Sequence, residues 1–269
     1  MNNNKSLIRV NADDFGISPG VNSAVIDMFQ AGKLHSASIM TGGRFFAQAV
    51  DFYQKNNGLK VGLHFCLTIG KCSSEALKLG LLVDENGVFK HGFLKLLILS
   101  IFKKKELQKQ VEIELRAQLD LLKKNNILIH HIDGHRHVHI IPAIWSVVLR
   151  VASEYGVKKI RHINESAIDS VCLTGDFNVF KNGGIVKWGV LRFLNFFNKS
   201  YQNSERFFSI LYTCRVDEKM FLKLQKSVKQ NFEIMIHPSD FEVDKNFLSE
   251  IEYEQDHLKS GDRFVEYWR

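Results

Sequence analysis

The feature that most constrains the fold of this chain is a regular alternation of short apolar runs with longer amphipathic stretches. The runs at residues 7–11, 36–41 and 60–67 are typical of buried strands, and stretches with helical spacing separate them. This alternation favours a largely parallel sheet, barrel or open, because parallel strands are joined by helical crossovers. For 269 residues we expect an α/β, TIM-barrel-like (β/α) barrel that forms a single domain over residues 1–269.

Several helices and strands can be placed from capping and periodicity. Ser18 can cap a helix that begins at Pro19, because a first helical residue needs no backbone N–H. The clearest helix covers residues 105–125, where a stripe of leucine and valine lies among charges. Further strands are expected at 127–133, 159–164 and 232–237, and further helices at 45–53, 142–155 and 218–230. Residues 166–203 follow no clear pattern.

The composition limits the class of protein and its surroundings. Hydrophobic residues make up 45% of the chain, enough for a substantial core, and the net charge of +7 suits anionic partners or simply a lysine-rich solvated surface. The four cysteines form no CxxC pair, which is typical of reduced thiols. The first ten residues are polar and no apolar run approaches about 20 residues, so we expect a cytoplasmic protein without a signal peptide or membrane span. No nucleic-acid partner is expected.

Candidate catalytic residues begin with Asp13 and Asp14, which follow the first expected strand. Reactive groups of α/β folds collect at such strand ends. Two adjacent buried carboxylates repel unless a cation compensates or they diverge, and divergence would let one bind a metal while the other acts as a base. A plain surface turn is the alternative, since aspartate favours turns. His64, near the end of an apolar strand, is either a metal ligand or a core histidine.

The strongest chemical signal is the histidine cluster at residues 130–139, which holds five of the chain's 11 histidines. Neutral imidazoles are the commonest ligands of divalent transition metals. A structural role for so many adjacent imidazoles is disfavoured, because protonated neighbours would repel one another. In an extended chain the alternate side chains from His131 to His139 would share one face. The cluster therefore indicates metal binding or catalysis, although spacing alone does not choose among its imidazoles.

Three more residues lie at the ends of expected strands. His237 ends the last strand and could donate a proton at the rim of a barrel. Arg161 and Glu165 could orient a substrate or the catalytic groups, or form a plain surface ion pair. Because the ends of parallel barrel strands converge at one mouth, all the candidate residues are expected to lie together. One aspartate and two histidines around a divalent ion are a known hydrolytic arrangement.

On these residues the sequence resembles the YdjC-like carbohydrate deacetylases, a family that includes chitooligosaccharide and hopanoid-associated deacetylases. The likeness rests on four motifs in order, VNADDFG at 10–16, GLHFCLT at 62–68, HIDGHRHVH at 131–139 and MIHPS at 235–239. Each motif is modest alone, but their combination is highly specific and covers nearly the whole chain.

The resemblance implies a TIM-barrel-like fold of the glycoside hydrolase/deacetylase type and one divalent metal ion, Mg²⁺ or Zn²⁺. By position, the family's metal ligands are matched by Asp14, His64 and His135. Asp13 matches its catalytic base, and His237 matches the histidine near the leaving amine. Two histidines suit Zn²⁺, whereas Mg²⁺ prefers oxygen ligands.

The implied function is metal-dependent removal of an N-acetyl group from an amino sugar, either a chitooligosaccharide or a lipid-linked glycan. We expect Arg161, Glu165 and His139 to bind this substrate. Two departures from the family are visible, Gly134 where many members have serine and Ser239 where many have glycine. Neither departure removes a ligand, although the second could alter the loop that carries the proton donor.

Two other classes of function stay open. A metal-dependent hydrolase of another amide or of a phosphoester would also suit the basic charge, and phosphatase turnover without acetate release would identify it. A non-catalytic sugar- or metal-binding protein would bind glycan without ever releasing acetate. The pair Asp13 and Asp14 argues against this second class, because binding alone needs no spare carboxylate beside the metal.

Two apolar segments, residues 93–102 and 188–197, stand apart from these motifs. Lysines 103–105 follow the first segment, and Arg192 lies inside the second. Such segments are either interfacial helices that contact a membrane and reach a lipid-linked substrate, or buried helices, or the surface of a homodimer. Their exposure in the monomer separates the first possibility from burial.

Overall fold

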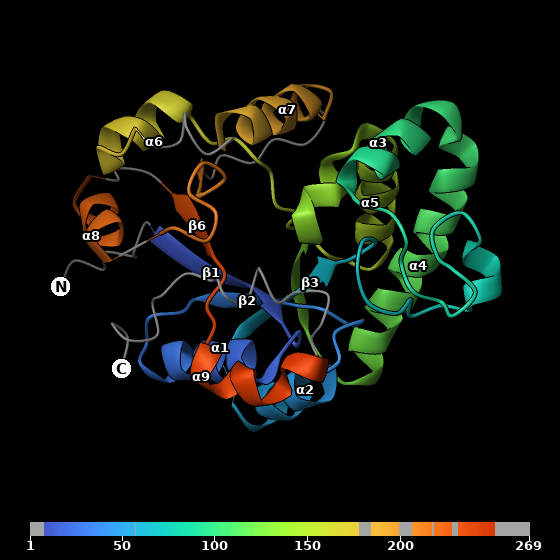
Figure 1. Ribbon diagram of the computed structural model, residues 1–269, viewed down its shortest axis with the longest axis horizontal. Coiled ribbons are helices and arrows are strands. Elements are labelled where there is room, and N and C mark those ends of the chain that lie inside the picture. The colour runs from blue at the N-terminus through green and yellow to red at the C-terminus, as the bar shows by residue number, and fades with distance from the viewer. Residues whose placement is uncertain are drawn as a thin grey trace.

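A six-stranded sheet forms the centre of the molecule, with helices packed around it (Figure 1). The computed structural model describes residues 8–56, 58–177, 184–198, 206–216, 218–227 and 231–250. The strands are β1 (Ile8–Phe15), β2 (Ser36–Ile39), β3 (Lys60–Phe65), β4 (Ile129–Gly134), β5 (Arg206–Phe208) and β6 (Phe232–Ile236). All neighbouring strands pair in parallel, as the alternation of strands and helices predicted.

The sheet is a curled half-barrel with the order β4-β3-β2-β1-β6-β5. Within the described residues its two edge strands, β4 and β5, do not pair with each other, so the sheet does not form the closed TIM barrel that we expected. Six strands are too few to close a barrel of that type, which needs eight. The strand expected at 159–164 is reduced to one parallel bridge between Ile160 and Ile132 of β4.

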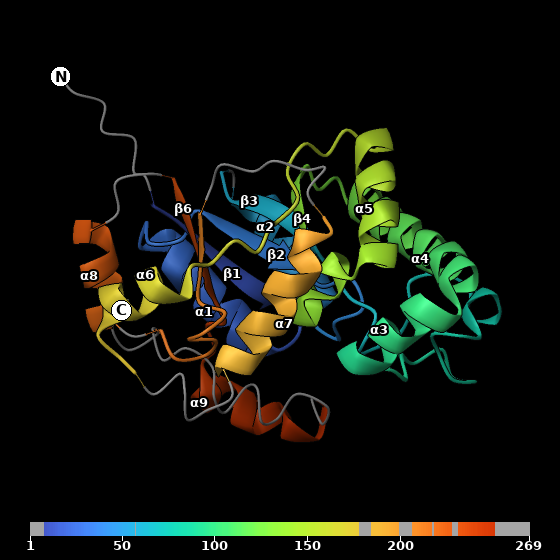
Figure 2. The same ribbon diagram turned by 90° about the horizontal axis from the view of Figure 1, so that it is seen from above.

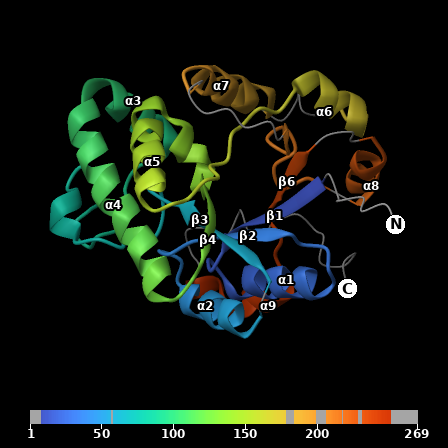
Figure 3. The same ribbon diagram turned by 180° about the vertical axis from the view of Figure 1, so that it is seen from behind.

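The helices cover the sheet in three groups, which Figures 1 and 3 show from opposite sides. The group at the bottom of Figure 1 comprises α1 (Pro19–Gln30), α2 (Phe46–Lys55) and α9 (Phe241–Asp244). The group beside β3 and β4 comprises α3 (Phe93–Phe102), α4 (Lys104–Lys124) and α5 (Pro142–Glu154). The remaining group comprises α6 (Ala167–Thr174), α7 (Gly184–Phe196) and α8 (Glu218–Ser227). Short 3-10 helices are η1 (Ala76–Leu79), η2 (His135–Ile140) and η4 (Lys245–Glu250).

The start of α1 confirms the predicted cap and also fixes the segment that follows β6. Ser18 Oγ accepts a hydrogen bond from the Val21 N–H at 3.1 Å, and Pro19 is the first helical residue. Asp244 of α9 accepts hydrogen bonds from the Gly20 N–H at 2.6 Å and from Ser18 Oγ at 2.9 Å. These bonds join α9 to α1 and thereby hold the short connection between β6 and α9, which begins with His237.

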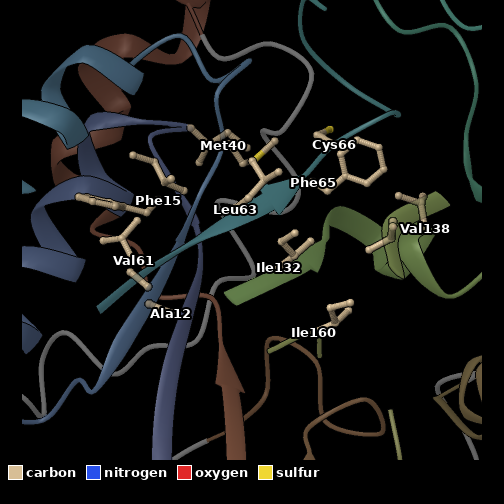
Figure 4. Close-up of a cluster of buried hydrophobic side chains, with 14 of the residues drawn as sticks. Ala12, Phe15, Met40, Val61, Leu63, Phe65, Cys66, Ile132, Val138 and Ile160 are labelled. Atoms are coloured by element: carbon tan, nitrogen blue, oxygen red, sulfur yellow. The ribbon is translucent and has the colours of Figure 1, made fainter. Parts of the chain in front are cut away.

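The main hydrophobic core lies where the strands meet the helices, and part of it is shown in Figure 4. Phe15 from β1, Leu63 and Phe65 from β3, and Ile132 from β4 are completely buried there. Val138 extends this cluster from the strands onto η2. The apolar runs recognised in the sequence therefore anchor the same strand ends that carry the candidate polar residues.

Both apolar segments of the sequence lie largely in helices, the first as α3 and the second mainly in α7. Each helix buries one side and exposes the other: α3 buries Leu96 and Leu99, and α7 buries Leu191 and Leu194. Neither segment is therefore a wholly buried helix. Across the described residues, no helix combines the length and apolar character needed to cross a membrane.

Candidate metal centre

Four strands bring the candidate residues to one edge of the sheet. Asp13 and Asp14 lie near the end of β1, and His64 lies near the end of β3. Asp133 of β4 is the register partner of His64, and His237 follows β6 directly. Parallel pairing therefore collects at one edge the groups that the sequence placed at separate strand ends.

The backbone of Asp14 explains how two adjacent aspartates diverge. Its φ of 64° is in the left-handed region, which is uncommon for residues other than glycine. The pairing of β1 with β2 also shifts register between Ala12 and Phe15, as in a β-bulge. Such an irregularity re-aims side chains at a strand end, and here it separates the carboxylate of Asp13 from that of Asp14.

Asp14 faces two imidazoles. Its Oδ1 lies 3.1 Å from His64 Nε2 and 3.0 Å from His135 Nδ1, and its Oδ2 lies 4.0 Å from His237 Nε2. The ligand atoms of Asp14, His64 and His135 lie within 4.8 Å of one another, and all three residues are buried. One carboxylate and two imidazoles at this spacing fit a divalent transition metal.

His64 links this cluster to a second carboxylate. Its Nδ1 lies 2.7 Å from Asp133 Oδ1, while its Nε2 points toward Asp14. A metal-binding histidine commonly donates its other ring N–H to a carboxylate, which fixes the tautomer and the orientation of the ring. Asp133 is therefore placed to present His64 Nε2 to a metal.

Arg161 joins three buried carboxylates on the Asp13 side of His64. Its Nη1 and Nη2 donate to Asp13 at 2.6 and 2.7 Å, and its Nε donates to Glu233 at 2.8 Å. Its Nη2 also lies 2.8 Å from Asp133 Oδ2. Asn11 Nδ2 donates to Asp13 Oδ1 at 2.8 Å. The planar, multiply donating guanidinium suits this arrangement, which holds Asp13 in one orientation.

The same surroundings shift the pKa values of the two aspartates in opposite directions. Burial alone would raise the pKa of Asp14, but His135 and His64 hold it well below its usual range. Burial raises the pKa of Asp13, although Arg161 opposes this shift. Burial would lower the pKa of His64, yet Asp133 and Asp13 raise it well above its usual range. Positive charge is thus favoured beside Asp14, where a bound cation would supply it.

A second set of ligand atoms, from Asp13, His64 and Asp133, also lies within 4.8 Å. There, however, the Arg161 guanidinium already sits between the two carboxylates as their counter-charge. The set of Asp14, His64 and His135 has imidazoles in that place, and these become ligands when they are neutral. We therefore take Asp14, His64 and His135 as the candidate metal centre.

The turn after β4 determines which imidazole of the histidine cluster reaches Asp14. The strand ends at Gly134, and Arg136 and His137 adopt left-handed φ values of 51° and 59° within η2. The prediction that alternate residues of the cluster share one extended face is therefore wrong beyond the end of β4. His135, the first residue of the turn, is the one that contacts Asp14.

Ser38 of β2 provides a further polar contact beneath the centre. Its Oγ donates to Asp133 Oδ2 at 2.6 Å and lies 2.9 Å from His131 Nε2. Gly62 of β3 leaves space for the His131 ring, because a Cβ atom at this position would lie 2.5 Å from it. Burial lowers the pKa of His131 to about 4, so this imidazole is neutral.

The three residues expected at the substrate are all buried, and each contacts other protein groups. Arg161 binds the carboxylates described above, and its backbone oxygen lies 3.1 Å from His139 Nε2. Glu165 accepts hydrogen bonds from Ser170 Oγ at 2.8 Å and from the backbone N–H groups of residues 209–211 at 2.8 to 3.3 Å. Burial raises the pKa of Glu165 to about 7. Arg161 and Glu165 have different partners, and both are buried, whereas a plain surface ion pair would have left them exposed.

The sequence patterns predicted no role for Asn11, Ser38, Asp133 or Glu233. A signal was present for each, because a polar or charged side chain in a strand buried on both faces requires a partner. Glu233 is the clearest case, since it stands alone among the apolar residues of β6. Its partner could not be identified without the structure.

These observations define the class of protein: an open parallel half-barrel that carries a cluster of aspartate and histidine residues at its strand ends. The sequence profile of the YdjC-like protein family matches residues 7–268. This chain therefore belongs to the YdjC-like family, as its four motifs indicated.

Similar proteins support the same assignment. A carbohydrate deacetylase of Brevibacillus brevis is 37% identical over 148 residues, which are 55% of this chain and 56% of that protein. A carbohydrate deacetylase of Oceanobacillus iheyensis is 26% identical over 94% of this chain and 96% of its own length. The crystal structure of a proposed cellobiose-phosphate cleavage protein from Enterococcus faecalis V583 matches with a TM-score of 0.63 and 21% identity. That match covers 97% of this chain and 92% of the other, and at this identity it supports the fold alone.

Proposed function

We propose that this protein is a metal-dependent carbohydrate deacetylase that removes an N-acetyl group from an amino sugar. The observation that carries the proposal is that the two adjacent aspartates have different partners. Asp14 faces His64 and His135, whereas Asp13 is held apart by Arg161. The names of the similar proteins indicate an acetylated sugar as the substrate class.

The metal would be held by Asp14, His64 and His135, whose donor atoms fit one divalent ion. Two imidazoles favour Zn²⁺ over Mg²⁺, because Mg²⁺ prefers a shell of oxygen ligands. When bound, such an ion supplies Lewis acidity, which polarises an amide carbonyl and lowers the pKa of water.

Asp13 is the general base of this proposal. Its carboxylate would accept a proton from the water that attacks the acetyl carbon. Arg161 and Asn11 fix the plane of the carboxylate through hydrogen bonds of 2.6 to 2.8 Å. Burial raises the pKa of Asp13, which strengthens it as a base.

His237 is the proton donor of this proposal. The C–N bond of the amide breaks, acetate leaves, and the amine of the sugar takes a proton from the protonated imidazole. The position of His237 supports this role, because its Nε2 lies 4.0 Å from Asp14 Oδ2 at the end of β6. Its side chain is also more exposed than those of His64 and His135, so it can approach a substrate from outside the metal centre.

Arg161, Glu165 and His139 act as positioning residues in this scheme. Arg161 orients Asp13, His139 contacts the backbone at Arg161, and Glu165 holds the backbone of residues 209–211. A groove of about 650 Å³ beyond the ends of β2 and β3 could receive the rest of the glycan. Its lining includes the polar side chains of Thr41 and Ser73, and such hydroxyl groups suit the hydrogen bonds of a sugar.

The extent of the family match supports one YdjC-like domain over residues 1–269. The cysteines in the described residues form no disulfide, which fits a reducing compartment such as the cytoplasm. We propose both points together with the activity.

Acetate release from a panel of N-acetylated amino sugars, soluble and lipid-linked, tests the function. The metal-stripped protein should release no acetate, and added Zn²⁺ should restore release from at least one sugar. Phosphatase turnover without acetate release would favour the phosphoester alternative. Glycan binding by the metal-loaded protein without any turnover would indicate a binding protein.

A further inference from the structure

The exposed sides of α3 and α7 form an apolar surface that the catalytic proposal does not use. We call it the α3–α7 face, and it consists of Leu94, Ile98, Ile101, Phe102, Val186, Val190, Phe193, Phe196 and Phe197. Leu94, Phe102 and Phe193 are exposed to 70%, 79% and 64%. Both helices lie along the top of Figures 1 and 3, and Figure 2 looks down on them. A contiguous apolar surface of this kind marks an interaction site.

The face is hollowed between the two helices. A groove of about 700 Å³ is lined by Leu97 and Ile101 of α3, by Val190 and Phe193 of α7, and by the start of α5 at Pro142. Its lining is almost entirely apolar, so it suits aliphatic chains better than a polar ligand.

The rim of the face is basic. Lys95 and lysines 103–105 border it on the α3 side, and Arg192 borders it on the α7 side, all of them exposed. Neither α3 nor α7 contains an aspartate or a glutamate. The border is predominantly basic, with Glu106 beside it paired to Lys103 at 3.5 Å. An apolar surface with such a border is complementary to a partner that is both apolar and anionic.

A second copy of this chain fits the α3–α7 face less well than an apolar, anionic partner does. A two-fold pairing of the face would bring the basic rim of each copy against that of the other, in a chain whose net charge is already +7. The helices, of 10 and 13 residues, are also too short to cross a bilayer, which takes about 20 residues. Helices with such composition lie in the plane of a membrane interface.

We propose that the α3–α7 face docks the protein on the surface of an anionic lipid bilayer. Phe102, Phe193 and their apolar neighbours enter the interface, and the lysines and Arg192 contact lipid phosphates. Both helices pack against η2, the turn that carries His135. A bound bilayer would therefore lie close to η2, which supplies the proposed ligand His135. Docking on the bilayer does not depend on catalysis.

Flotation with lipid vesicles tests the proposal on the full chain. The wild-type protein should float with vesicles of phosphatidylcholine and phosphatidylglycerol, and poorly with phosphatidylcholine alone. The double variant Phe102→Ser/Phe193→Ser should bind the anionic vesicles roughly tenfold more weakly. The control Leu77→Ser removes an even more exposed apolar side chain, 98% exposed on η1, and should leave binding unchanged.

A matched pair of charge variants tests the basic rim. Lys104→Glu and Lys124→Glu change residues at opposite ends of α4, roughly 30 Å apart, and only the first lies at the face. Lys104→Glu should weaken binding several-fold and lower its sensitivity to salt, and Lys124→Glu should not. Absence of wild-type binding to anionic vesicles, or equal loss in the face and control variants, would overturn the proposal. So would a stable wild-type dimer that Phe102→Ser/Phe193→Ser converts to monomer while vesicle binding is unaffected.

Discussion

Asp13 and Asp14 are adjacent in the chain, yet their carboxylates enter two regions of opposite chemistry. On one side, Asp14 contacts the imidazoles of His64 from β3 and His135 from η2, which can lose a proton and become neutral. On the other, Asp13 meets a permanent cation, Arg161, which also binds Asp133 and Glu233. His64 stands between the two regions, with one ring nitrogen facing each. The comparison shows how a half-barrel keeps two adjacent carboxylates in separate surroundings, as the proposed metal ligand and the proposed base require.

A left-handed backbone at Asp14 makes this separation possible. Residues in that region are usually strained unless the surrounding structure holds them, and such strain concentrates at functional sites. The two regions therefore predict different consequences for variants that are close in space.

The largest expected effect belongs to the Asp13 region. Arg161→Met would leave three carboxylates buried without their shared cation, and should lower the free energy of unfolding by about 3–5 kcal/mol. Urea denaturation measures this change. A loss below about 1 kcal/mol would mean that the network carries little charge, and would contradict the division into two regions.

Asp13→Asn should affect turnover and spare the metal. Loss of the general base is expected to lower kcat for deacetylation by about 10²–10⁴-fold. Metal content should stay at the wild-type level, because Asp13 is not among the proposed ligands Asp14, His64 and His135. Acetate release measures the loss of turnover, and the metal content of the same sample shows whether the metal is retained. Full activity in this variant would show that another group is the base.

Asp133→Asn should produce an intermediate effect, since this residue contacts both regions. Loss of the carboxylate that orients His64 is expected to weaken metal binding by about 10–100-fold. Competition with a metal chelator measures the affinity. Ser38→Ala, which removes the 2.6 Å hydrogen bond to Asp133, is the milder companion and should weaken binding less. Unchanged affinity in Asp133→Asn would exclude a role for Asp133 in orienting the ligand.

The smallest effect is expected far from both regions, in the open ion pairs between α4 and α5. Arg150 and Arg116 lower the pKa of Glu112 to about 2, and its side chain is 28% exposed. Because the folded-state pKa is lowered, the pairs stabilise the protein above pH about 4.5, and this contribution is lost as pH falls toward 2. With allowance for solvent screening, Glu112→Gln should cost about 1 kcal/mol or less near neutral pH. Denaturation of both proteins across pH 2–7 would show curves that converge at the acidic end, and a constant difference would contradict the assignment.

The sequence was sufficient to predict the parallel α/β character, the start of α1, and the gathering of Asp14, His64, His135 and His237 at the strand ends. These features depend on local periodicity, caps and the geometry of parallel strands, which short segments encode. The sequence did not predict how far the sheet closes into a barrel, because the segment at 159–164 has the pattern of a strand but pairs only at Ile160.

The role of Arg161 could not be predicted from the sequence either. As one charged residue at a strand end, it could equally have faced solvent, and only the fold places Asp13, Asp133 and Glu233 around it. The helix α6 and the strand β5 were missed for a similar reason, and α7 was anticipated only through the apolar segment 188–197. Their segments lie within or next to residues 166–203, where the sequence shows no dominant period.

The most direct test of the two-region account is Zn²⁺ titration of the metal-stripped protein in three forms. Wild type and Asp13→Asn should each bind one ion per chain with similar affinity. Asp14→Asn should bind at least about 100-fold more weakly, because it alone loses a ligand. Loss of binding in Asp13→Asn together with retention in Asp14→Asn would contradict the account.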